Sequence, residues 1–146
     1  MATVSTYLNF PRRTEEAFNY YKSIFGGEFK GGIMRFGDMP PMEGMPALPD
    51  VDKQLVVHIE LPILGGHILM GTDAPESMGF SLNFGNNMHI QLSPDTRKEA
   101  DRLFSALSAD GSVTMPIQDM FWGAYFGSTT DKYGVQWMVN CEEKKG

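Results

Sequence analysis

The chain has a single cysteine, Cys141, and this scarcity excludes two kinds of structure. One thiol can form neither an internal disulfide nor a thiolate cage around a metal, and such low cysteine usage suits a reducing compartment. We interpret Cys141 as a small, half-buried residue at the end of a strand. The alternative, a nucleophile, is disfavoured because Glu142 and Glu143 would oppose formation of a thiolate.

Basic residues and long apolar runs are also scarce. There are 12 Lys and Arg against 18 Asp and Glu, and the formal net charge of −6 argues against nucleic acid or an anionic membrane surface as a partner. No stretch approaches the roughly 20 apolar residues of a membrane span. The first ten residues, MATVSTYLNF, lack the basic start and apolar core of a signal peptide. We therefore expect a cytoplasmic protein without a nucleic-acid or membrane partner.

Several motifs that would define a reaction are missing from the sequence. It contains no glycine-rich phosphate loop with its lysine, no GxSxG, no HExxH and no Cys and His pair for a nucleophile. The motifs therefore leave open whether the chain is an enzyme.

Aromatic residues, by contrast, are concentrated in the stretch from Asp119 to Asn140, DMFWGAYFGSTTDKYGVQWMVN. Glycines divide this stretch, which predicts two short strands joined by a polar turn. Alternation in the second strand puts Gln136, Met138 and Asn140 on one face and Val135, Trp137 and Val139 on the other. A mixed face of this kind is typical of the lining of a cavity.

The first half of the chain predicts the order β-α-β-β-β. Thr14 offers an N-cap, and Gly26 and Gly27 end the helix. The expected segments are a strand over 4–10, a helix from 14 to 24, an extended stretch over 29–36, a strand over 54–64 and a hairpin into a strand over 67–72.

The second half returns to the same pattern after a linker-like stretch at 73–87. Pro94 and Asp95 open a helix, and Gly111 ends it. The helix lies between an expected strand over 87–93 and further strands over 112–115, 124–129 and 135–141. An offset of 83 aligns the two helices and places Thr6 on His89, whereas an offset of 68 places Met70 on Met138. We interpret this as a duplicated βαβββ module, at about 1–75 and 85–146, within a single domain of residues 1–146.

A long segment, 37–52, separates two expected strands of the first module. It reads GDMPPMEGMPALPDVD, and its prolines at 40, 41, 46 and 49 block both helix and ladder. One interpretation is a lid over a pocket. The other, which we favour, is an ordered surface connection in which Met39, Met42 and Met45 plug one end of the fold.

The tandem modules, with YLNF, EEAFNYYKSIFGGEF, HILMGTDAPE, FWGAYFG and TDKYGVQWMVN in this order, resemble the vicinal oxygen chelate superfamily. This superfamily includes glyoxalase I, extradiol dioxygenases and bleomycin-resistance proteins, and within it the chain is most similar to the PhnB-like group, often labelled demethylubiquinone methyltransferase-like. The resemblance implies an α+β fold in which tandem βαβββ modules form an incompletely closed eight-stranded barrel. It also implies a homodimer.

Enzymes of this superfamily hold a divalent metal with one ligand from each of four strands. These positions fall on Thr6, Met70, His89 and Met138, so His89 is the only retained ligand type. Hydroxyl and thioether groups are poor ligands for such ions, and we therefore expect no metal cofactor, although a divalent metal stays possible. The methyltransferase label is doubtful as well, because S-adenosylmethionine sites usually lie on a doubly wound parallel sheet.

Other side chains also have two interpretations. His58 and Glu60, with His67 across the hairpin, could share an ion, but we favour a solvent-facing strand surface. Asp119 could be a general base, but a turn carboxylate is commoner.

Our preferred hypothesis is a homodimeric protein that binds a small, largely apolar organic molecule in a barrel pocket. The expected lining is Thr6, Leu8, Met70, His89, Gln91, Phe121, Trp122 and Met138. One alternative is a lyase or dioxygenase that uses a divalent metal through His89. Another is a filled pocket in a chain that acts through its dimer surface.

Overall fold

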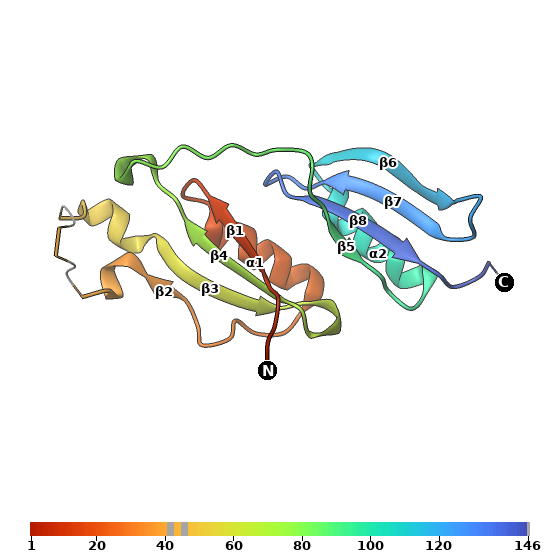
Figure 1. Ribbon diagram of the computed structural model, residues 1–146, viewed down its shortest axis with the longest axis horizontal. Coiled ribbons are helices and arrows are strands. Elements are labelled where there is room, and N and C mark those ends of the chain that lie inside the picture. Colours follow the sequence, from red (N-terminus) through yellow and green to blue (C-terminus); the bar gives the residue numbers. More distant parts are fainter. Residues whose placement is uncertain (41–42, 45–46, 146) are drawn as a thin grey trace. The chain divides into compact units, whose positions relative to one another are not determined.

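The structure is a computed structural model that describes residues 1–40, 43–44 and 47–145. The chain divides into two compact units, Met1–Leu82 and Asn83–Gly146. The described residues of each unit form one α-helix and four strands, and the α-helix lies along one face of its own sheet (Figure 1). No helix among the described residues is long and apolar enough to cross a membrane.

The first unit is a mixed four-stranded sheet with the spatial order β1-β4-β3-β2. β1 pairs with β4 in parallel, and the other two pairs are antiparallel. Its elements are β1 (Thr6–Phe10), α1 (Thr14–Phe25), β2 (Met34–Arg35), β3 (Val56–Pro62) and β4 (Ile68–Asp73).

The second unit repeats this topology with the order β5-β8-β7-β6, in which β5 and β8 form the parallel pair. The predicted βαβββ order is therefore confirmed in both halves, and neither sheet closes on itself. The elements are β5 (Ile90–Leu92), α2 (Arg97–Ser108), β6 (Ser112–Asp119), β7 (Tyr125–Thr130) and β8 (Gln136–Cys141).

Each core lies between a helix and its sheet. In the first unit Phe18 is completely buried against Gly71, where an added Cβ would lie 2.4 Å from Phe18 Cε1. In the second unit Trp137 is fully buried and donates its indole N–H to Asp131 Oδ2 at 2.8 Å. Cys141 is fully buried rather than half-buried, because it lies at the end of β8 on the face that packs against α2.

Several sequence-based boundaries differ from the structure. The strand expected over 87–93 is limited to Ile90–Leu92, and α2 begins at Arg97, capped by Thr96, rather than at Pro94 and Asp95. The extended stretch expected over 29–36 contains only the two-residue strand β2, whereas β6 continues through Pro116 to Asp119 with two register shifts. Thr14 is the first helical residue of α1 rather than its N-cap. Its backbone N–H donates instead to Asp73 Oδ1, from the end of β4, at 3.0 Å.

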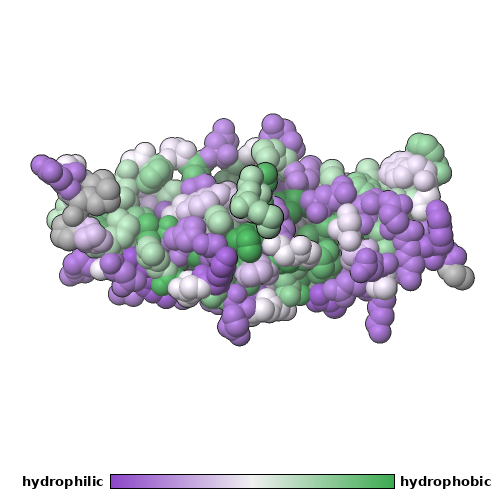
Figure 2. All heavy atoms as spheres, turned by 60° about the horizontal axis from the view of Figure 1, so that its bottom comes forward, coloured by the Kyte–Doolittle hydropathy of each residue, from purple (hydrophilic) through white to green (hydrophobic). Residues whose placement is uncertain are grey.

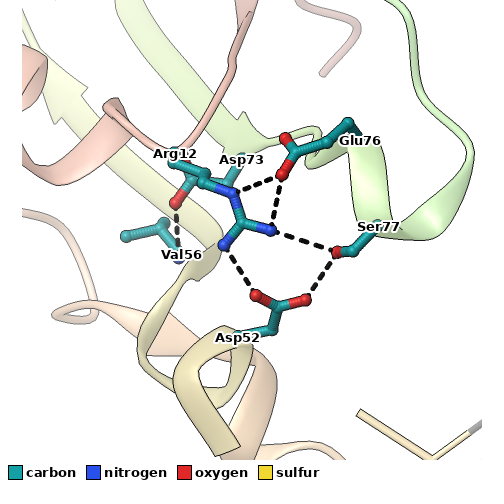
Figure 3. A network of polar contacts seen from close by, with 6 residues as sticks. All are labelled: Arg12, Asp52, Val56, Asp73, Glu76 and Ser77. Atoms are coloured by element: carbon teal, nitrogen blue, oxygen red, sulfur yellow. Dashed lines mark hydrogen bonds and ion pairs between the residues drawn. The ribbon is translucent and has the colours of Figure 1, made fainter. Parts of the chain in front are cut away.

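The segment after β2 begins and ends in short 3₁₀ turns, η1 (Phe36–Asp38) and η2 (Asp50–Gln54). Asp52 in η2 is buried and accepts hydrogen bonds from Arg12 at 2.6 Å and from Ser77 at 2.5 Å (Figure 3). These two bonds hold the pKa of Asp52 below its ordinary value. The network ties the end of the segment to the loop after β1 and to η4 (Glu76–Met78). Met42 and Met45, with Pro41 and Pro46, lie outside the described residues.

Strand register corrects one part of the predicted repeat. Thr6 pairs with Leu69 in the first unit, and Ile90 pairs with Trp137 in the second. Leu69 and Trp137 are 68 residues apart, as predicted, but Thr6 and Ile90 are 84 apart rather than 83. Thr6 therefore corresponds to Ile90 and not to His89, because a one-residue shift moves a strand side chain to the other face.

Candidate functional site

The face of the second sheet opposite α2 gathers three of the predicted site residues. Gly127 faces α2, since a Cβ there would lie 2.8 Å from Phe104, and it is in register with Val139. Alternation therefore places Met138 on the opposite face, together with its partner Gln91 on β5. His89 comes one residue before β5 begins, and extending the alternation of the strand by one residue assigns it to the same face. We call the set His89, Gln91, Phe126, Ser128 and Met138 the β5–β8 face.

An aromatic cluster lies at one end of this face. Trp122, in the turn between β6 and β7, contacts Phe126 edge to face at a centroid distance of 6.3 Å. Phe121 contacts Trp122 in the same way at 4.9 Å, and these two side chains are 98% and 57% exposed. Large exposed aromatic surface next to polar side chains such as the exposed Gln91 is the composition expected of a ligand-contacting surface.

The three predicted residues of the first unit do not share one face. Met70 lies opposite α1, because its neighbours Leu69 and Gly71 face the helix. Thr6 and Leu8 are in register with those two neighbours and therefore point to the α1 side. Thr6 Oγ1 also lies 2.8 Å from His67 Nε2, so these two side chains are hydrogen-bonded to each other.

The position beside Met70 belongs to Tyr7, which the sequence analysis missed. Tyr7 on β1 and Glu60 on β3 are both in register with Met70. The Tyr7 hydroxyl lies 3.2 Å from His58 Nδ1, and His58 Nε2 lies 2.9 Å from Glu60 Oε2. His58 and Glu60 thus share a face, as predicted, whereas His67 lies on the other one. The sequence signal for Tyr7 is the alternation of β1, because Tyr7 and Asn9 occupy the face opposite that of Thr6 and Leu8.

Asp119 lies at the end of β6 in a bidentate ion pair with Arg97, at 2.7 and 3.0 Å. The Arg97 guanidinium also stacks on the Tyr125 ring at 3.9 Å. The hydrogen bonds from Arg97 lower the pKa of the Asp119 carboxyl, which makes it a weaker base. This geometry fits a structural carboxylate better than a general base.

The metal site of the enzyme branches does not fit these side chains. Two of the four family positions are thioethers, Met70 and Met138, and a third, Thr6, points to the α1 side. Neutral thioethers are poor ligands for hard or borderline divalent ions. Among the described residues, no group of three or more His, Cys, Asp and Glu side chains could hold a metal.

The two βαβββ modules define a protein of the glyoxalase fold class, and comparisons with known proteins agree. A glyoxalase/bleomycin resistance/dioxygenase family enzyme from Burkholderia phytofirmans has the same fold, with a TM-score of 0.61 at 17% identity, over 94% of this chain and 98% of the other. The predicted fold class is therefore confirmed.

Closer matches identify the family. The family model described as 3-demethylubiquinone-9 3-methyltransferase matches residues 2–140, so the chain belongs to this PhnB-like family of the vicinal oxygen chelate superfamily. Protein YjdN of Escherichia coli K12 is 31% identical over 97% of both chains. The crystal structure of PA1353 from Pseudomonas aeruginosa is similar with a TM-score of 0.82 at 37% identity, over 97% of this chain and 98% of that one. A putative 3-demethylubiquinone-9 3-methyltransferase, PhnB protein, from Bacillus cereus has a TM-score of 0.74 at 28% identity, over 96% and 99%.

The topology bears on the methyltransferase name of the family. Each sheet has four strands and one parallel pair, so neither is a doubly wound parallel sheet with helices on both faces. The family relationship therefore supports the fold, and the chemistry has to be argued from the side chains. On the face shown in Figure 2, hydrophobic side chains lie among hydrophilic ones.

Proposed function

We propose that this PhnB-like protein binds a small, largely apolar organic molecule, with the β5–β8 face and the Trp122 cluster as contacts. The observation that supports this most directly is the register of Gln91 with Met138 on a half-exposed face that continues to Phe126 and Trp122. An unbranched thioether and an aromatic ring supply adaptable apolar contact. Gln91 and His89 would orient a polar group of the ligand.

The predicted pocket lining is revised in two respects. Thr6 and Leu8 are left out because they point toward α1, and Phe126 is added because it lies on the same face as Met138 and contacts Trp122. Met70 stays a candidate contact of the first unit. We further propose a homodimer in the cytoplasm, as the family resemblance implies, and sedimentation equilibrium would test the dimer.

Tryptophan fluorescence tests the binding proposal because the two tryptophans differ in exposure. Trp122 is 57% exposed and Trp137 is fully buried, so a bound aromatic or quinone-like compound should quench Trp122 selectively. We expect saturable quenching by some members of a panel of such compounds, and loss of this signal in Trp122→Phe.

A matched pair of methionine variants locates the contact. Met138→Ala should weaken binding several-fold, or by about 1 kcal/mol, since it removes a thioether contact. Met78→Ala, the same change in η4 of the first unit, should leave the affinity unchanged. Silence across the whole panel, or equal effects of the two variants, would count against the proposal.

A further inference from the structure

The face of the first sheet opposite α1 holds a chain of three hydrogen-bonding side chains that the proposed binding function does not use. Glu60 and His58 come from β3, and Tyr7 comes from β1. The contact between Tyr7 and His58 crosses β4, which lies between these two strands. The Tyr7 and His58 rings lie 5.7 Å apart with an interplanar angle of 38°. We call these three residues the Tyr7 relay.

The direction of the hydrogen bonds follows from the donor inventory. A Glu60 carboxylate can only accept, so His58 Nε2 must donate to it and the neutral imidazole keeps its lone pair on Nδ1. Nδ1 therefore accepts from the Tyr7 hydroxyl. Burial is the largest cause that raises the pKa of Tyr7, which keeps its proton in place at neutral pH, as this direction requires.

The relay is open at one end. Tyr7 is 48% exposed, and because its proton points to His58, the oxygen offers a donor from outside the lone pair that is not taken by the neighbouring Thr72 hydroxyl. The side chains of His58 and Glu60 are 33% and 24% exposed, so they are more sheltered than the phenol. This order, from a sheltered carboxylate through an imidazole to an accessible hydroxyl, is the arrangement in which a base removes a proton from a bound group.

The surroundings indicate which kind of molecule would lie there. Met70 is in register with Tyr7 and Glu60, and Met34 is in register with His58. Thioethers next to a polar group favour a flat aromatic ring that carries a hydroxyl. Glu60 is the one Asp, Glu, Lys or Arg side chain that the described residues of β1, β3 and β4 place on this face, and Arg35 of β2 is paired with Glu15 of α1.

We propose that the Tyr7 relay is a proton-accepting site for a small aromatic molecule with an acidic hydroxyl, such as a phenol. The ligand O–H bond breaks and its proton passes to Tyr7 Oη, while the proton of Tyr7 moves to His58 Nδ1. The products are a bound phenolate and an imidazolium that is paired with Glu60, so charge and atoms balance without an oxidant or metal. This inference does not depend on the β5–β8 face.

4-Nitrophenol tests the inference because its phenolate absorbs visible light and its neutral form does not. In a buffer that keeps the free probe mostly neutral, the wild-type protein should generate phenolate in a saturable manner, with bound probe counted by equilibrium dialysis. Tyr7→Phe and His58→Gln should each lower the phenolate formed per bound probe at least tenfold. Tyr125→Phe removes a phenol that donates to Asp101 in the second unit, and should match the wild type.

Each result decides the question. No binding at millimolar probe, probe bound only in its neutral form, or equal phenolate in wild type and Tyr7→Phe would overturn the inference. Should His58→Gln fail to fold, as judged by circular dichroism, Tyr7→Phe carries the test alone because it removes a single half-exposed oxygen atom.

Discussion

The two units solve the same packing problem with glycine in different strands. In the first unit Phe18 of α1 packs on Gly71 of β4, whereas the equivalent positions of the second unit are Asp101 and Val139. There the space for an aromatic ring lies at Gly127 of β7, where an added Cβ would be 2.8 Å from Phe104 Cε1. Both units thus place a glycine beneath an aromatic ring of the helix, but not at equivalent positions.

The helix starts differ in a related way. In the first unit the last strand ends in Asp73, whose carboxylate accepts from the backbone N–H groups of Thr14 and Val56 at 3.0 and 2.8 Å. The matching position of the second unit is Cys141, which cannot take this role, and α2 is capped by its own Thr96, which accepts from Glu99 N–H at 3.1 Å. Glu143, just after β8, also accepts from the backbone N–H of Arg97 at 2.6 Å. Both helix starts are therefore held by a carboxylate from the end of the last strand or just beyond it, and the second unit adds a local cap.

The largest effect is expected when the first packing arrangement is changed. Gly71→Ala should destabilise the protein by about 3 kcal/mol, because its Cβ would overlap Phe18 and the buried side chain has no room to move. Urea unfolding measures the loss. Combining it with Phe18→Leu should give less than the sum of the two single losses, and simple additivity would contradict the proposed overlap.

Replacing Asp73 by the residue of the second unit comes next. Asp73→Cys should cost about 2 kcal/mol, since two buried backbone N–H groups lose their acceptor. Hydrogen exchange should show faster opening of the first turn of α1. An unchanged exchange rate at Thr14 would mean that this contact does not hold the helix start.

Removing the local cap should have a smaller effect. Thr96→Ala is expected to cost about 1 kcal/mol, and Thr96→Ser, which keeps the hydroxyl acceptor, should cost far less. Thermal unfolding of the two variants compares them directly. Equal losses in both would show that the methyl group, and not the cap, matters at this position.

The smallest expected effect concerns the pair of Glu15 with Arg35. The hydrogen bonds from Arg35 lower the pKa of Glu15, so the pair stabilises the fold above the ordinary pKa of a glutamate and this contribution is lost as the pH falls through the lowered value. Because Glu15 is well exposed, Glu15→Gln should cost only about 0.5 kcal/mol at pH 7. At a pH below the lowered pKa of Glu15, urea unfolding should give Glu15→Gln and the wild type the same free energy of unfolding. A difference between them that grows as the pH falls would contradict the expected pH dependence.

The sequence predicted the modules well because helix and strand periodicities are local signals. The buried positions Ala17, Ile24, Ala100 and Leu107 appear at the predicted helical spacing, and Trp137 and Val139 at the predicted strand spacing. The face of the first strand could not be predicted in this way. Five residues contain too little alternation to fix a register that pairing with β4 decides, and Tyr7 was therefore not found from the sequence.

Strand periodicity also explains why some candidate site residues share a face as expected and others do not. Gln91 and Met138 are register partners in the pair β5 and β8, so both lie on one face of the sheet. A one-residue error in the predicted alternation of either strand would have put them on opposite faces. The Tyr7 relay joins strands that are not neighbours in the sheet, and a contact across β4 is invisible to sequence spacing.

Native mass spectrometry of the protein purified without chelator tests most directly whether this chain binds organic molecules in place of the metal of its superfamily. The prediction is a chain that contains no stoichiometric metal and takes up one aromatic compound from the panel, with weaker uptake by Met138→Ala. One divalent ion per chain, lost in His89→Ala, would contradict it.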